Sequence, residues 1–247
     1  MQMFIYGVLW IILIHIILRS FFKLNHTHSM TIVKLLCLIL IGYKSIEYGL
    51  HWIQGDFTKM PVEYSAITYL LFSFTYLLNI KSLKPFVTFA AFLSGIGYLL
   101  AFPFLGSAFI AGNGLTKTLL ALLNHSLLYL GSMIVMKNYQ YSMESRKTIL
   151  IYTFAVVAYS IAMQYLINFE NKFLFIYMLL DGRILYNMFD NIDINGFIYL
   201  PYNILIITVY LGMISMFYKI NSRIYRLHHE RFDTKSKKGA FKHDHTV

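Results

Sequence analysis

Seven long apolar stretches, separated by short polar breaks, run through most of the chain. They cover residues 3–22, 32–53, 62–80, 86–105, 115–136, 149–167 and 197–218. Each has about the 20 residues that a helix needs to cross a hydrocarbon layer of about 30 Å. The pattern therefore predicts an all-α, polytopic membrane bundle of seven transmembrane helices.

Glycine and proline mark several of the breaks between these stretches. Gly55-Asp56 and Pro61 precede the third stretch, Pro85 opens the fourth, and Gly112-Asn113-Gly114 precedes the fifth. The connection 168–196 is longer and contains an apolar patch, Phe173–Leu180. This patch is too short to cross a bilayer and predicts a re-entrant or interfacial segment.

The composition agrees with a membrane protein. Of the 247 residues, 58% are hydrophobic and 13% are charged, and the mean hydropathy is +0.60. Soluble domains are about 45–50% apolar, so a separate soluble catalytic domain is excluded. One cysteine, Cys37, excludes an intramolecular disulfide and a Cys-rich zinc site. We expect no metal and no cofactor.

The basic residues indicate an orientation. Counted in or beside alternate loops, one side receives Arg19, Lys23, Lys34, Lys81, Lys84, Lys137, Arg146, Lys147 and eight more from Lys219 to Lys242, and the other receives Lys59, Lys172 and Arg183. The positive-inside rule then predicts an outside amino terminus and a transmembrane domain, 1–218, followed by a basic cytoplasmic tail, 219–247. The tail is expected to extend the seventh helix to about residue 234 and to attract anionic lipid headgroups. Because topology accounts for the net charge of +10, no nucleic-acid partner is predicted.

Four polar residues share one face of the second stretch. Lys44, Glu47, Tyr48 and His51 are spaced by three, four and seven residues. Charged groups inside a bilayer cost free energy and tend to face a bundle interior or a wet cavity. Two interpretations remain open: a Lys–Glu pair that neutralises itself and joins helices, or the polar wall of a cavity that opens outward.

Further polar residues are expected at the same depth. Glu63 and Ser65 begin the third stretch, Lys117 begins the fifth, and Asn124 and His125 lie near its middle. With the amino terminus outside, they outline a polar pocket in the outer leaflet half together with the second stretch. His125 is either a hydrogen-bonding link between helices or a base.

Small residues follow one side of the fourth stretch. They are Ala91, Ser94, Gly95, Gly97 and Ala101. Small side chains let helix backbones approach closely in a membrane. We therefore predict that this face packs against another helix.

Two short runs resemble a known family. They are Met60-Pro61-Val62-Glu63-Tyr64-Ser65-Ala66-Ile67 and Asn124-His125-Ser126-Leu127-Leu128-Tyr129-Leu130-Gly131. They look like the best-marked segments of the YwaF-like bacterial integral membrane proteins, which are remotely similar to a vertebrate transmembrane acyltransferase that moves fatty acyl groups between phospholipids. The resemblance covers roughly residues 40–218. In the vertebrate relatives a Cys and a His are thought to carry the transfer; His125 matches the His, and Ser65 stands where the family has the Cys.

Three functions are compatible with these features. The first is a lipid-directed acyltransferase or lipid hydrolase in which His125 is the base, Ser65 the nucleophile, and Glu63 or Glu47 orients the imidazole. The second is a small transporter or ligand-binding membrane protein that binds a solute or relays protons through polar residues of the spans, namely Lys44, Glu47, His51, Glu63 and His125. The third is a non-catalytic envelope assembly partner. In each case the resemblance implies a bacterial cytoplasmic membrane and membrane lipids as partners.

Overall fold

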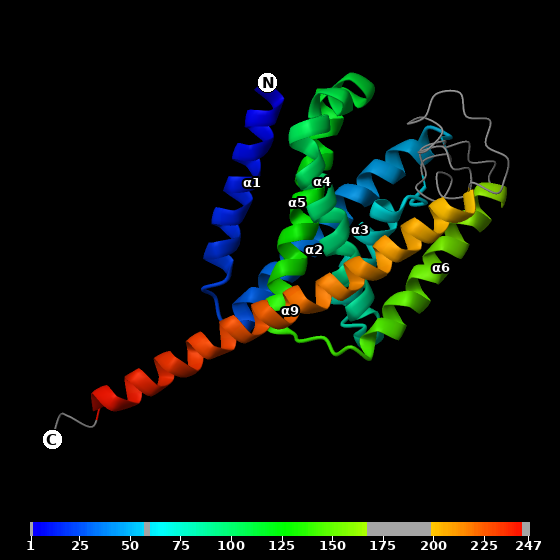
Figure 1. Cartoon of the computed structure of the whole chain (residues 1–247). Coiled ribbons are helices and arrows are strands. Elements are labelled where there is room, and N and C mark those ends of the chain that lie inside the picture. Colours follow the sequence, from blue (N-terminus) through cyan, green and yellow to red (C-terminus); the bar gives the residue numbers. More distant parts are fainter. Residues whose placement is uncertain (1, 57–59, 167–198, 244–247) are drawn as a thin grey trace.

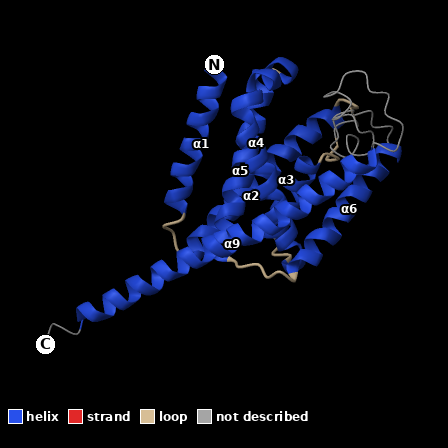
Figure 2. Cartoon of the chain, viewed as in Figure 1, coloured by secondary structure: helices blue, strands red, loops and turns tan. Residues whose placement is uncertain are grey.

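The computed structural model describes residues 2–56, 60–166 and 199–243, and within them all regular structure is helical (Figures 1 and 2). The elements are α1 (Gln2–Phe21), α2 (His26–Ile53), α3 (Tyr64–Leu77), the 3₁₀ turn η1 (Lys81–Leu83), α4 (Lys84–Asn113), α5 (Leu115–Asn138), α6 (Ser145–Leu166) and α9 (Tyr199–His243). The predicted all-α class is confirmed. The patch Phe173–Leu180 lies outside the described residues.

Four of the described helices are long and apolar enough to cross a membrane. They are α1, α2, α4 with the preceding η1, and α5. By length and composition, these helices are compatible with a multi-pass membrane protein. The seven-span topology and the inside-outside orientation stay predictions.

Helix α2 begins six residues before the predicted second stretch. The Asn25 side chain accepts a hydrogen bond of 2.9 Å from the backbone N–H of His28. Asparagine is among the strongest N-cap residues because its carbonyl satisfies an N–H that the helix leaves unpaired. A polar cap, which hydropathy does not detect, therefore sets this boundary.

Helix α3 is shorter than predicted at both ends. It has 14 residues instead of the stretch 62–80, which is about 21 Å of helix at 1.5 Å per residue. Glu63 occupies the N-cap position, and the chain leaves the helix at Leu78. Asn79 then has a φ of 56°, a left-handed conformation that asparagine tolerates better than most residues.

Helices α4 and α5 form the centre of the bundle. They make the most extensive interhelical contacts. In the most apolar window of each helix, 67% of the α5 residues and 56% of the α4 residues are buried, against 17% for α1. Helix α1 is therefore peripheral, and α5 is the best shielded of the four apolar helices named above.

Close approach of α4 and α5 depends on Gly95. A Cβ atom there would lie 2.7 Å from the backbone nitrogen of Tyr129 and 2.8 Å from the carbonyl oxygen of His125. The predicted packing face is thus confirmed at Ala91 and Gly95, which are both buried. It is wrong at Gly97, which is exposed, because two residues rotate the position by about 200° around a helix.

Helix α9 runs obliquely across the bundle, and its carboxy-terminal part projects away from the other helices (Figure 1). It continues without a break through residue 218 to His243, about nine residues beyond the predicted end near 234. Asn221, which is fully buried, fixes α9 to the end of α5. Its Nδ2 donates to the carbonyls of Met136 at 3.0 Å and Tyr139 at 2.8 Å, and its Oδ1 accepts from the N–H of Tyr141 at 2.9 Å.

Candidate functional site

His125 lies in the middle of α5 and is 8% exposed. Its Nδ1 is 3.0 Å from the carbonyl oxygen of Ser94 on α4 and 3.2 Å from the Ser94 hydroxyl. A carbonyl oxygen can only accept, so Nδ1 carries the proton and Nε2 keeps its lone pair. Within the described part of the chain, no hydrogen bond to Nε2 is found. The tautomer with a free basic Nε2 is therefore fixed by the α4 backbone.

Two tyrosine rings hold the imidazole in place. Tyr98 of α4 stacks parallel to it, with ring centroids 4.3 Å apart and an interplanar angle of 3°. Tyr69 of α3 approaches edge-on at 5.5 Å and 64°. Both arrangements are favourable for aromatic pairs. Three helices thus determine the position of one buried histidine ring.

The charged pair of α2 adjoins this ring through Tyr69. The Nζ atom of Lys44 lies 2.6 Å from the Oε2 atom of Glu47, and the side chains are 12% and 36% exposed. The same ammonium lies 5.3, 5.7 and 5.0 Å from the ring centroids of Tyr43, Tyr48 and Tyr69, within the range of cation–π attraction. Tyr69 therefore contacts both Lys44 and His125. We call Lys44, Glu47, Tyr69, Tyr98 and His125 the polar cluster.

The third predicted segment reaches the polar cluster in part. Glu63 is exposed, but its carboxylate interacts electrostatically with the hydroxyls of Tyr48 and Tyr69. Ser65 is half-buried, one turn before Tyr69 on the same face of α3. Tyr69, instead of Ser65, occupies the position against His125. Among the described residues, the hydrogen bond between Ser65 and His125 that a catalytic dyad needs is not formed.

The remaining predicted residues fall into two groups. Asn124 is 5% exposed and directly precedes His125 in α5, so it lies beside the polar cluster. His51 pairs instead with Asp56 at the end of α2, with Nδ1 3.1 Å from Oδ2. Lys117 is exposed in the first turn of α5, about 12 Å along the helix from His125. The structure therefore does not bring His51 and Lys117 into the polar cluster.

Sequence reasoning assigned Ser94 to helix packing and gave Tyr69 and Tyr98 no role. The signal was present: Ser94 and Tyr98 are four residues apart, and so are Ser65 and Tyr69, so each pair shares a helix face. What the sequence lacks is the register between α3, α4 and α5. That register decides which of these side chains meets His125.

A buried lysine lies at the end of α5. Lys137, which the sequence analysis counted in or beside a loop, is in the last turn of this helix and is 0% exposed. Its ammonium donates to the carbonyls of Phe21 at 3.3 Å and Leu24 at 2.7 Å, and to the Ser29 hydroxyl at 2.8 Å. A cation at the carboxy-terminal end of a helix is favourable because the carbonyls there are the negative end of its dipole. Lys137 therefore joins the end of α1 to α5 and the start of α2.

The chemistry available at the polar cluster is that of a neutral base, an ion pair and phenols. In the ranges that the structure describes, no group of three or more His, Cys, Asp or Glu residues is placed to hold a metal ion.

Comparisons of the chain with protein-family models, with curated proteins and with solved structures found no match.

Proposed function

We propose that this multi-pass membrane protein is a lipid-directed acyltransferase or lipid hydrolase in which His125 is the general base. The observation that carries the proposal is the hydrogen bonding of the two ring nitrogens of His125. Its Nδ1 is committed to the Ser94 carbonyl at 3.0 Å, and Nε2 has no partner among the described residues. A histidine oriented by one nitrogen and basic at the other is the arrangement that activates a hydroxyl nucleophile.

In the proposed reaction, Nε2 removes the proton of a hydroxyl while the oxygen bonds to the acyl carbonyl carbon. The resulting tetrahedral intermediate collapses, the bond from this carbon to the leaving oxygen breaks, and the imidazolium returns the proton to that oxygen. The Lys44 ammonium is the nearby positive charge that could stabilise the oxyanion. Atoms and charge balance without an oxidant, a reductant or a metal.

The geometry favours a hydroxyl of the substrate over Ser65 as the nucleophile. A general base must reach the proton it takes, with heavy atoms about 2.6–3.2 Å apart, and among the described residues no hydrogen bond joins Ser65 to His125, whose ring contacts Tyr69. The acceptor is then a lipid hydroxyl for transfer or water for hydrolysis. This differs from the role that the YwaF-like resemblance implies for the Ser65 position.

The proposed setting is a bacterial cytoplasmic membrane, with its lipids as partners. A location in a membrane is supported by the four helices that are long and apolar enough to span one. The bias of lysine and arginine supports a cytoplasmic basic tail that binds anionic headgroups. The polar cluster would then lie in the outer half of the bilayer.

The test is an acyl-transfer and hydrolysis measurement in proteoliposomes that contain a phospholipid with a labelled acyl chain. His125→Gln should reduce product formation at least 100-fold, the lower range for loss of a general base. The matched control is His15→Gln. His15 is a histidine of α1 whose Nε2 lies 3.4 Å from the Tyr129 hydroxyl, and its loss should leave the rate within twofold.

The variant Ser65→Ala distinguishes between the two possible nucleophiles, a hydroxyl of the substrate and the hydroxyl of Ser65. An unchanged rate identifies the substrate hydroxyl, and a loss equal to that of His125→Gln identifies Ser65. If wild-type protein forms no labelled product in either reaction, or if folded His125→Gln keeps the wild-type rate, the proposal is wrong.

A further inference from the structure

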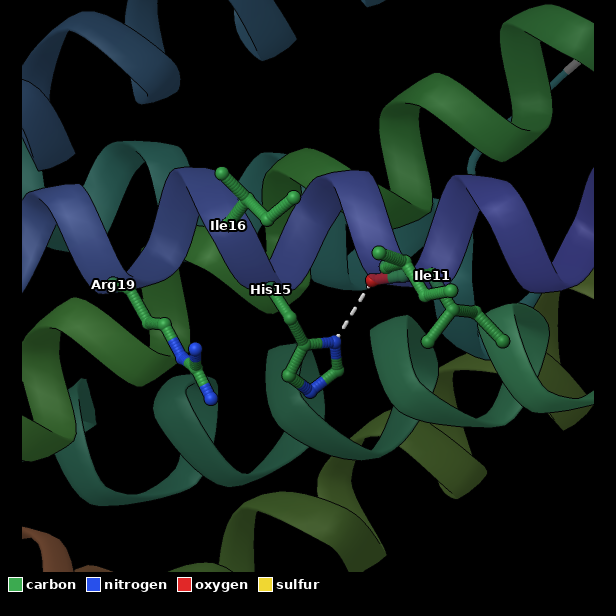
Figure 3. Close-up of a pocket in the computed structure, with 5 residues that line it drawn as sticks. Ile11, His15, Ile16 and Arg19 are labelled. Atoms are coloured by element: carbon green, nitrogen blue, oxygen red, sulfur yellow. Dashed lines mark hydrogen bonds between the residues drawn. The ribbon is translucent and has the colours of Figure 1, made fainter.

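Helix α1 has a hollow on its surface at a place where a cation lacks a counter-ion. The hollow has a volume of about 320 Å³ and is lined by Ile11, Ile12, His15, Ile16 and Arg19. His15 and Arg19 extend to the same side of α1 (Figure 3). All five residues belong to α1, so the hollow is an open groove along one helix, and a lipid can lie along it.

The two polar residues of the hollow differ in their partners. His15 has hydrogen-bond partners, whereas Arg19 has no carboxylate partner within the described ranges. The Nδ1 atom of His15 donates to the Ile11 carbonyl at 2.9 Å, as Figure 3 shows, and its Nε2 faces the Tyr129 hydroxyl at 3.4 Å. Ion pairs within the described ranges join Lys44 to Glu47, His51 to Asp56 and Arg226 to Glu230. Arg19 therefore has no carboxylate partner there, and its guanidinium presents unused donors to the hollow.

Arg19 is also not needed to neutralise the end of α1. Lys137 already donates to the Phe21 and Leu24 carbonyls that follow the last turn. An exposed arginine in the last turn of a membrane helix attracts anionic lipid headgroups. Guanidinium binds phosphate oxygens well because its planar fork makes two parallel hydrogen bonds.

The walls of the hollow and the outer face of α1 are apolar. Ile12 is 50% exposed and Ile16 is 56% exposed, and the helix is peripheral in the bundle. In a membrane these side chains contact acyl chains. The occupant that fits both the charge and the walls is an anionic phospholipid in the leaflet that contains the carboxy-terminal end of α1.

We propose that this hollow is a binding site for one anionic phospholipid, with Arg19 on the phosphate and Ile12 and Ile16 against the acyl chain. The site is separate from the polar cluster, so it does not depend on acyl chemistry at His125. It also differs from general attraction of the basic tail, because it requires one arginine and one apolar wall.

The test is native mass spectrometry of the purified full chain in mild detergent, with phosphatidylglycerol and phosphatidylcholine of identical acyl chains. We expect one phosphatidylglycerol bound about tenfold more tightly than phosphatidylcholine, and Arg19→Gln should remove this preference. The charge control is Lys23→Gln, which lies in the turn after α1 and is exposed. It should change the affinity less than twofold.

A second pair of variants tests the apolar wall without changing charge. Ile12→Trp fills the hollow and should weaken phosphatidylglycerol binding about tenfold. Leu13→Trp, at a position 45% exposed on the same helix but outside the lining, should leave it unchanged. Inorganic phosphate should not displace the lipid, because it has the charge but no chain.

Three outcomes would overturn the proposal. Equal losses for Arg19→Gln and Lys23→Gln would mean that general surface charge attracts the lipid. An unchanged affinity for Ile12→Trp would mean that the hollow is not used. Displacement by inorganic phosphate would mean an anion site without a lipid chain.

Discussion

Lys44 and Glu47 form a short ion pair within α2, with 2.6 Å between Nζ and Oε2. Each charge compensates the other in surroundings where a single charge is costly. The pair was one of two interpretations of the sequence pattern, and the structure shows that it forms. Since Tyr69 connects it to His125, the pair also belongs to the candidate site.

The coupling of this pair can be measured with a double-mutant cycle. Glu47→Gln or Lys44→Met should each lower the melting temperature of detergent-purified protein by about 3 °C or more. The double substitution should lower it less than either single change, because no unpaired charge remains. Melting curves that give the sum of the single losses would contradict the pairing.

Lys137 provides a second test at the scale of one residue. Lys137→Met leaves three oxygen acceptors without their donor, and each such loss costs about 1–3 kcal/mol when buried. We expect a loss of about 3 kcal/mol, which lowers the melting temperature by roughly 6–12 °C in a chain of this size. Thermal unfolding followed by intrinsic fluorescence measures it, and exposed Lys147→Met should shift the midpoint by no more than about 1 °C.

At the scale of elements, the α4–α5 contact decides the position of His125. A Cβ at Gly95 would meet backbone atoms of α5 at 2.7 and 2.8 Å, whereas a Cβ at Gly97 meets nothing within 4 Å. The helices cannot absorb the first contact by rotating a side chain, because the neighbouring atoms include backbone.

Gly95→Ala should therefore force the two helices apart and destabilise the protein by about 1–3 kcal/mol. Gly97→Ala, two residues away on the same helix, should be neutral or stabilising by up to about 1 kcal/mol, since alanine favours helix over glycine. Chemical or thermal unfolding of both variants in one detergent checks the difference. Equal losses would mean that helix propensity, and not the interhelical contact, determines the effect.

Hydropathy could predict the helices because apolar length follows directly from the thickness of a bilayer. It could not predict the start of α2 at Asn25 or the short α3, since those boundaries depend on a cap and on a left-handed Asn79. The polar residues of the site could be selected by the cost of placing them in a membrane. Their partners could not, because Ser94, Tyr69 and Tyr98 meet His125 through the register of separate helices.

At the scale of the whole molecule, the seven-span topology predicts opposite locations for the fourth connection and the tail. Asn113→Cys should react with a membrane-impermeant maleimide from outside intact cells, and Thr234→Cys should react after the membrane is opened. Cys37 is buried at 0% exposure and gives a low background. Labelling of both positions from the same side would contradict the topology.

Helix α9 also has a mechanical property. Its 45 residues make a rod about 68 Å long at 1.5 Å per residue, more than twice the thickness of the hydrocarbon layer. Asn221, which binds the end of α5, is its middle residue, so it serves as a fulcrum between two arms of equal length. On the amino-terminal arm, the Tyr210 hydroxyl lies 2.6 Å from Thr153 of α6 and 3.5 Å from the Tyr64 hydroxyl of α3. A sideways force on the projecting arm would therefore be transmitted, reversed in direction, to the helix that holds Tyr69 against His125.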